Sequence, residues 1–202
     1  MNQNYFKLPK FKQDRLINAG YKIFGTFPYK KASMAELADE AGISKSLLFY
    51  YFKNKKEYYL YLFSTALQFL SEHLTLDLHG ERADLFALVD QTIAKRMDLL
   101  RSYPYIFRFT ASAYYEKTQE LMSEIERKKK LMMKLGKKEL VKIIRLDLFK
   151  DPDDAGDLID IILNIVEGCM RGREDLEIEK IQEVIPEYQK MMASLRAHYY
   201  KD

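Results

Sequence analysis

Residues 33–55, SMAELADEAGISKSLLFYYFKNK, constrain the fold of this chain more than any other stretch. Ser33, followed three residues later by Glu36, predicts a capping box at the start of a short helix. Gly42 stands where that helix has to stop, at a position that favours a residue free to adopt positive φ. Ser44 predicts the N-cap of a second helix. The stretch therefore predicts two short helices joined by a tight turn.

The second helix of this pair is predicted to have two different faces. Leu48 and Phe52 are spaced i, i+4 and form its buried face. The opposite face carries Lys45, Ser46, Phe49 and Tyr50. In DNA-binding helix-turn-helix proteins the second helix enters the major groove N-terminus first. The layout therefore indicates DNA binding.

The same stretch, with Phe24 upstream, resembles the N-terminal domain of the TetR family of bacterial transcriptional regulators. The matching residues are Phe24, Ser33, Leu37, Ala38, Ala41, Gly42, Ile43, Ser44, Leu48, Tyr51, Phe52 and Lys55. They span about a quarter of the chain. The resemblance implies a repressor that a small molecule releases from a palindromic operator. Leu47 and Phe49 depart from the family pattern, which usually has a small or polar residue and a tyrosine there, and this affects the operator sequence that is read.

The charge distribution supports the same interpretation. Residues 1–56 contain eleven Lys and Arg against four Asp and Glu, a net charge of +7, which leaves −4 for the rest of a chain whose total is +3. A basic N-terminal quarter is typical of a module that meets phosphate. Residues 1–9 are predicted to be a frayed arm, either along the DNA backbone or free in solvent. The predicted DNA-binding residues are Ser33, Ser44, Lys45, Ser46, Leu47, Phe49, Tyr50 and Lys55.

The rest of the chain is predicted to form a helical body, so we expect an all-α protein. Apolar residues recur at helical spacing, and no strand-like alternation of useful length occurs. We predict a three-helix DNA-binding domain over residues 1–54 and a larger ligand-binding and dimerisation domain over residues 55–202. An uninterrupted helix over residues 55–73 is predicted to link them.

The body offers candidates for an effector site. Aromatic and methionine side chains recur there, and Asn164 and Glu167 are polar residues in a strongly apolar helix that need partners if they are buried. The predicted ligand-binding residues are Phe63, Phe86, Met97, Tyr105, Phe107, Tyr115, Asn164 and Glu167. The expected effector is apolar or amphipathic, and the alternative for these residues is ordinary core packing.

The last two predicted helices, residues 153–171 and 174–200, suggest a homodimer. The first is apolar on more than one face, and the second carries an apolar seam with steps of three and four residues, interrupted by Pro186, which is predicted to kink it. The predicted interface residues are Ile162, Val166, Ile181, Ile185, Tyr188, Met192 and Leu195. The alternative is that both stripes pack inside one subunit.

Two other functions remain open at this point. Asp153, Asp154 and Asp157 form a D-D-x-x-D pattern that suits a magnesium-dependent all-α enzyme, although acidic residues also favour any helix N-terminus. An architectural DNA binder without a ligand is the other alternative. We expect no enzyme activity, no cofactor, no metal site and no membrane span. Cys169 is the single cysteine, which suits the cytoplasm, and we expect no signal peptide.

Overall fold

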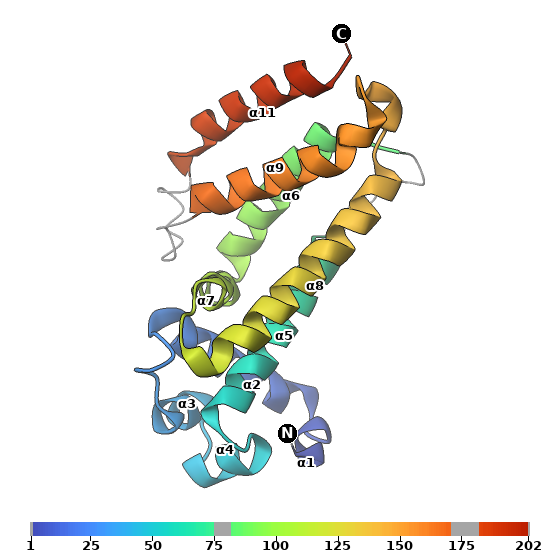
Figure 1. Cartoon of the computed structure of the whole chain (residues 1–202). Coiled ribbons are helices and arrows are strands. Elements are labelled where there is room, and N and C mark those ends of the chain that lie inside the picture. The colour runs from blue at the N-terminus through green and yellow to red at the C-terminus, as the bar shows by residue number, and fades with distance from the viewer. Residues whose placement is uncertain (1, 75–81, 171–181, 202) are drawn as a thin grey trace. The chain divides into compact units, whose positions relative to one another are not determined.

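The computed structural model describes residues 2–74, 82–170 and 182–201, and in these ranges the chain is helical (Figure 1). The prediction of an all-α fold with an N-terminal helix-turn-helix is confirmed. The chain forms two compact units, unit 1 from Met1–His73 with Leu100–Lys129 and unit 2 from Leu74–Leu99 with Lys130–Asp202. The division into functional domains at residues 1–54 and 55–202 is a different boundary and stays a prediction.

Unit 1 contains the helices that form the N-terminal module. These are α1 (Gln3–Phe6), α2 (Lys10–Thr26), α3 (Met34–Ala41), α4 (Lys45–Tyr51) and α5 (Lys55–His73), joined by α7 (Pro104–Tyr114) and the start of α8 (Gln119–Ile143). The predicted helix over residues 55–73 coincides with α5. Pro104 lies in the first turn of α7, where its missing N–H leaves no helical hydrogen bond unmade.

Helix α1 replaces the frayed arm predicted over residues 1–9, so that prediction is wrong. The Asn2 side chain accepts a hydrogen bond from the Asn4 N–H at 2.9 Å and caps the helix. Tyr5 is fully buried, and its ring lies 5.0 Å from that of Phe52 and 5.3 Å from that of Tyr61. Burial of such a side chain stabilises by ~1.5–3 kcal/mol, enough to hold one turn of helix against the module.

The core of unit 1 is aromatic. The ring of Phe24 lies 4.9 Å from that of Tyr59, and Tyr59 lies 5.1 Å from Phe109, so α2, α5 and α7 meet at one cluster. Gly25 permits this approach, because a Cβ there would lie 3.1 Å from the Phe109 backbone nitrogen. Burial raises the pKa of the Tyr59 hydroxyl, which therefore stays protonated. The module and α7 are consequently parts of one packed unit.

Unit 2 contains most of α6 (Leu85–Ser102), the rest of α8, two 3-10 helices, η1 (Leu146–Leu148) and η2 (Pro152–Asp154), and the helices α9 (Ala155–Met170) and α11 (Ile185–Tyr199). Helices α9 and α11 run side by side (Figure 1). The core of the unit consists of Leu85, Phe86, Leu88, Ile144, Phe149, Ala155, Leu158, Ile159, Ile162, Tyr188, Met192 and Tyr200. Helix α8 continues through Gly136, so glycine does not break it.

Pro186 does not kink the last helix, which corrects the prediction. Helix α11 begins at Ile185, and the proline lies in its first turn. In that position its ring has no preceding helical turn to clash with, and its missing N–H is one of those left unpaired at any helix start. The first part of the helix predicted over residues 174–200, residues 174–181, lies outside the described residues.

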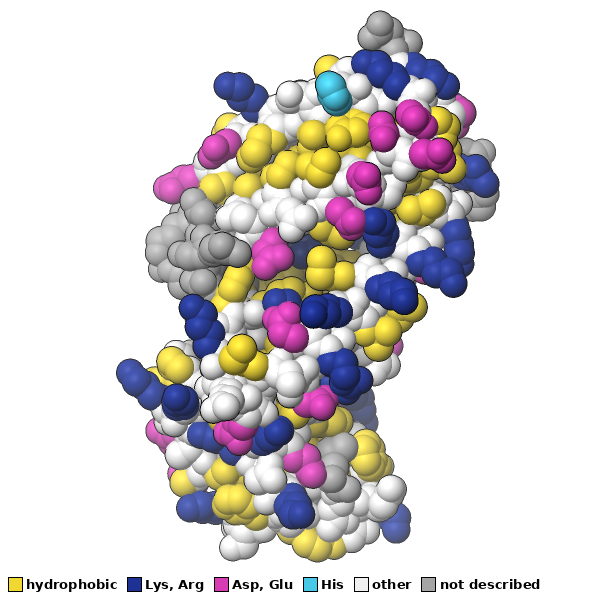
Figure 2. Space-filling model, in the orientation of Figure 1, with side chains coloured by type: hydrophobic (Ala, Val, Ile, Leu, Met, Phe, Trp, Pro, Cys, Tyr) yellow, Lys and Arg dark blue, Asp and Glu magenta, His cyan; other side chains and the backbone are white. Residues whose placement is uncertain are grey.

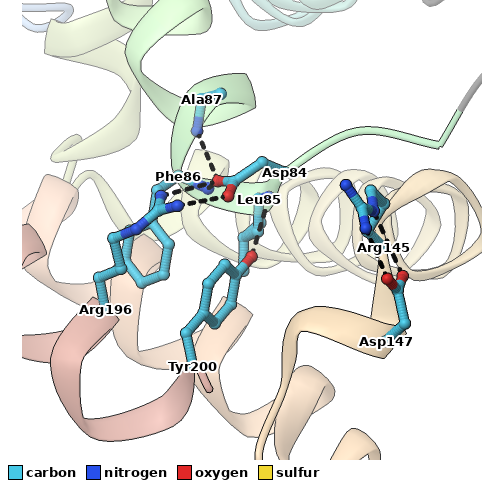
Figure 3. A network of polar contacts seen from close by, with 8 residues as sticks. All are labelled: Asp84, Leu85, Phe86, Ala87, Arg145, Asp147, Arg196 and Tyr200. Carbon is cyan, nitrogen blue, oxygen red and sulfur yellow. Dashed lines mark hydrogen bonds and ion pairs between the residues drawn. The ribbon is translucent and has the colours of Figure 1, made fainter. Parts of the chain in front are cut away.

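A polar network ties the C-terminal end of the chain to the start of α6 (Figure 3). The Asp84 carboxylate accepts from the N–H groups of Phe86 and Ala87 at 2.8 and 3.1 Å and pairs with the Arg196 guanidinium at 2.9 Å. The Tyr200 hydroxyl accepts from the Leu85 N–H at 3.1 Å. Three N–H groups of the first turn of α6 are therefore satisfied by side chains.

Candidate nucleic-acid interface

Helix α3 begins at the predicted capping box, which the structure confirms. Ser33 Oγ accepts from the Glu36 N–H at 3.1 Å, and Glu36 Oε2 accepts from the Ser33 N–H at 2.9 Å. The hydrogen bond from the Ser33 backbone N–H, and secondly that from its hydroxyl, lower the pKa of the Glu36 carboxyl. The helix therefore starts at a fixed residue.

The turn between α3 and α4 depends on Gly42, as predicted. Gly42 has φ 65°, the left-handed conformation that favours glycine, and its N–H is bonded back to α3. Arg15, on α2, donates from Nη2 to the Ala41 carbonyl oxygen at 2.9 Å. A Cβ on Gly42 would lie 2.1 Å from that nitrogen, so the guanidinium occupies the space next to the glycine. No local pattern pointed to Arg15, because it lies 26 residues from its acceptor.

The two faces of α4 differ as expected from the sequence. Ser44 caps the helix by accepting from the Leu47 N–H at 3.1 Å, and Leu48 is fully buried. Leu47, Phe49 and Tyr50 keep 36%, 41% and 50% of their surface exposed, and Lys45 and Ser46 are exposed beside them. Five side chains of one short helix are thus left available to another molecule.

Lys55 lies at the other end of the module and already has partners in the chain. Its Nζ donates to the carbonyl oxygens of Tyr29 and Ala32 at 2.8 and 2.9 Å, and it lies 4.4 Å from the centre of the Tyr29 ring. These bonds hold the loop between α2 and α3 against the start of α5. They use two of the three ammonium donors, so contact with a phosphate, which stays a prediction, would use the third.

Asn4 belongs to the same surface, although no sequence pattern pointed to it. Its Nδ2 donates a hydrogen bond to the Tyr50 hydroxyl, across 46 residues of chain. The backbone N–H of Asn2 donates to the Tyr51 carbonyl oxygen at 3.0 Å. Helix α1 therefore lies against the C-terminal end of α4. No spacing rule could have linked residues so far apart.

The predicted effector residues are divided between the two units. Phe63, Tyr105, Phe107 and Tyr115 belong to unit 1, and Phe86, Met97, Asn164 and Glu167 belong to unit 2. Phe63 is buried with its ring 6.3 Å from that of Tyr114, and Tyr105 is exposed. Phe86 is part of the core of unit 2. Asn164 is exposed and donates to the Asp160 carbonyl oxygen at 2.8 Å, so it needs no ligand to satisfy it. The effector site stays a prediction.

The predicted dimer seam is largely used inside the chain. Ile162, Tyr188 and Met192 are buried in the core between α9 and α11. Val166 and Leu195 pack partly buried against that core, and Ile185 is partly buried at the start of α11. Ile181 lies outside the described residues. In the described residues these side chains pack against a helix of the same chain, and the dimer interface stays a prediction.

The acidic pattern at residues 151–157 begins a helix. Asp151 accepts from the Asp153 N–H at 3.0 Å, Asp154 ends η2, and Asp157 lies in the first turn of α9. Carboxylates at these positions stabilise the unpaired N–H groups there. Among the residues that the structure describes, no group of three or more His, Cys, Asp or Glu is placed to hold a metal ion. Nor is any described helix long and apolar enough to cross a membrane.

The comparisons with known proteins agree with this geometry. Residues 16–62 match the family model described as "Bacterial regulatory proteins, tetR family". Three similar solved structures are a TetR family transcriptional regulator from Chloroflexus aurantiacus J-10-FL, MexZ from Pseudomonas aeruginosa and FadR from Bacillus halodurans.

Their likeness extends along nearly the whole chain. The Chloroflexus protein is 21% identical with a TM-score of 0.63, covering 100% of this chain and 99% of that one. MexZ is 17% identical (TM-score 0.64, 93% and 96%), and FadR is 16% identical (TM-score 0.62, 95% and 96%). No curated protein sequence matches at a significant level. The match over residues 16–62 shows that this chain carries the DNA-binding module of the TetR family of bacterial transcriptional regulators, and the solved structures show that the chain shares the fold of such regulators.

Proposed function

We propose that the protein is a cytoplasmic homodimeric repressor that binds a palindromic operator and is released from it by a small apolar or amphipathic ligand. The observation that carries the proposal is the outer face of α4, where Leu47, Phe49 and Tyr50 remain exposed beside Lys45. Three large apolar or aromatic groups exposed together beside a lysine form the kind of patch that marks an interaction site.

The chemistry of that face suits the major groove. Lys45, in the first turn of α4, donates to guanine O6 and N7 or to a phosphate. Leu47 is suited to the C5-methyl group of thymine, which is the apolar feature of that groove. Ser33 and Ser44 cap helices whose N-terminal N–H groups favour a phosphate nearby. The proposed operator therefore contains thymine steps next to a guanine.

Dimerisation is proposed because two half-sites must be read together. Figure 2 shows apolar side chains gathered over α9 and α11. Leu163 remains exposed on α9, and Val166 is only partly buried there. The proposed contact pairs these outer faces with those of a second copy, while the inner faces keep the core of unit 2 closed.

Release by a ligand is proposed to act through α7. The ring of Phe63 on α5 lies 6.3 Å from Tyr114 of α7, and Phe69 lies 5.0 Å from Tyr103 just before it. Helix α7 also packs closely on α2 at Gly25. A ligand that displaces α7 would therefore shift both helices that carry the DNA-binding module. Coupling of ~1–3 kcal/mol would weaken DNA binding 5–150-fold.

Two of the similar proteins support parts of this proposal. MexZ is described as a repressor, which favours repression over activation. FadR is described as a regulator of fatty acid degradation, which favours an apolar or amphipathic effector. The likeness is one of fold, so the effector and the direction of regulation remain proposals for this chain.

The DNA-binding part is tested by selecting duplexes from a random library with the full-length protein and measuring affinity for the selected duplex. Lys45→Ala should lower affinity by ~1–3 kcal/mol for that duplex and less for a scrambled one. Lys190→Ala, an exposed lysine on α11, is the matched control and should bind like wild type. Equal affinities for all three proteins would contradict the placement of α4 in the groove.

The dimer and the ligand need separate measurements. Leu163→Asp should dissociate the dimer in sedimentation at micromolar concentration, whereas Met122→Asp, the same change at an exposed position of α8, should not. A thermal-shift screen of fatty acids and aromatic amphiphiles should yield ligands, and each should weaken DNA binding in a titration. Ligands that bind tightly and leave DNA affinity unchanged would refute release by an effector.

A further inference from the structure

The C-terminal end of α4 is held by the first helix of the chain. The Asn2 N–H donates to the Tyr51 carbonyl oxygen at 3.0 Å, and carbonyls at a helix C-terminus lack partners within the helix. Tyr5 is fully buried, with its ring 5.0 Å from Phe52 directly after α4. These contacts fix α1 relative to the outer face of α4, so a side chain of α1 can act on a residue of that face.

Asn4 makes such a contact with Tyr50. Its amide Nδ2 donates to the Tyr50 hydroxyl oxygen. A phenolic hydroxyl has one hydrogen to donate and an oxygen that accepts. The Asn4 amide donates to the Tyr50 hydroxyl oxygen, so it cannot accept the hydroxyl hydrogen. That hydrogen therefore points away from Asn4 and is available to another acceptor. Tyr50 is half exposed, and in the hydrogen bonds of the described residues its hydroxyl donates to no acceptor.

We propose that Asn4 is a positioning residue that orients the Tyr50 hydroxyl as a hydrogen-bond donor to a DNA phosphate, which makes α1 part of the DNA interface. This inference rests on the proposed docking of α4. Tyr50 lies near the C-terminal end of α4 (Lys45–Tyr51), away from the N-terminal residues that reach base edges in a helix-turn-helix. Phosphate oxygens only accept hydrogen bonds, so a hydroxyl fixed as a donor suits them.

The charge of the neighbouring segment favours the same partner. Lys7 directly follows α1, Lys12 lies in the first turn of α2, and both side chains are exposed. Phosphate contacts position a protein on the duplex and carry no sequence information. The Asn4–Tyr50 pair should therefore set the register of α4 on the backbone, while Lys45 and its neighbours read the bases.

The test is a double-mutant cycle on DNA affinity. The variants are Asn4→Leu, which keeps the size of the side chain and removes its donor, Tyr50→Phe, which removes the hydroxyl, and the two combined. The probes are the duplex selected by wild-type protein and a scrambled duplex of the same length. Each single variant should lose roughly 2–12-fold in affinity on both duplexes, as expected for one hydrogen bond. The combined variant should lose no more than either single variant.

Two controls separate positioning from a structural role. Gln3→Leu changes the adjacent exposed position of α1 and should bind like wild type, and Asn4→Gln restores a donor and should recover part of the affinity. The thermal midpoints of the variants should match that of wild type, because Asn4 is exposed. A midpoint lowered for Asn4→Leu together with unchanged affinity would show that the contact only stabilises α1.

The outcomes distinguish this inference from the proposed function. If Asn4→Leu leaves affinity unchanged, or weakens binding equally in the Tyr50→Phe background, Asn4 does not act through Tyr50 and the inference is overturned. In that case a loss of affinity in Lys45→Ala would still support the docking of α4. If wild-type protein selects no duplex at all, the proposed function and this inference fail together.

Discussion

Replacing Lys55 with methionine tests a side chain that makes two hydrogen bonds and a cation–π contact at the edge of the DNA-binding module. The change keeps the aliphatic stem and removes the ammonium that bonds to two carbonyl oxygens at 2.8 and 2.9 Å and lies 4.4 Å from the Tyr29 ring centre. A hydrogen bond from a charged donor contributes ~1.5–3 kcal/mol and an exposed cation–π contact ~0.5–1 kcal/mol. Because the site is only half buried, water can replace part of this, and we expect a net loss of about 2–3 kcal/mol.

The assay is thermal and urea unfolding followed by circular dichroism. For a chain of 202 residues the expected loss lowers the thermal midpoint by ~4–12 °C. Lys45→Met is the matched control, since Lys45 is exposed, and its midpoint should stay within about 1 °C. An unchanged midpoint for Lys55→Met would refute the conclusion that this lysine holds the loop before α3. If Lys55 also reaches a phosphate, the log–log salt slope of DNA binding should become about one unit shallower.

Three further outcomes follow from single contacts. Gly42→Ala should lower the free energy of unfolding by ~1–2 kcal/mol because the residue has φ 65°, and by a further ~0.5–1.5 kcal/mol because the new Cβ displaces the Arg15 guanidinium. Urea unfolding measures the sum. A loss near zero would contradict the requirement for glycine in this turn. Asp84→Ala should destabilise the protein by ~1–2 kcal/mol because α6 loses its N-terminal cap. Asp84→Asn can still cap the helix and should destabilise it less. Equal losses for the two variants would show that the ion pair with Arg196, and not the cap, stabilises this end of α6. Phe49→Tyr should strengthen binding to both the selected and the scrambled duplex if the added hydroxyl reaches a phosphate, and titration at one salt concentration decides this.

The helix-turn-helix could be predicted because its determinants are local. The Ser33–Glu36 capping box spans three residues, and Gly42 acts through its own backbone conformation, so each can be recognised from neighbouring letters. The bounds of α5 matched the prediction because its periodic apolar stripe and its flanking residues indicate the same first and last residues. Residue 186 shows the limit of such rules, because proline disrupts a helix interior and favours a first turn, and only the position of the helix start decides between them.

Sequence alone determined the helical class, the turn module and the buried faces of α4 and α11. It did not determine what lies against those faces. The apolar seam through Tyr188 and Met192 packs against α9 of the same chain, and the pattern of residues could not distinguish that partner from a second subunit. Similarly, Lys55 bonds to carbonyls 23 and 26 residues away, and Tyr50 is held by a residue 46 positions earlier. Periodicity reports only that a side chain leaves water, whereas the choice of partner depends on how distant segments pack, and that was decided only in the tertiary structure.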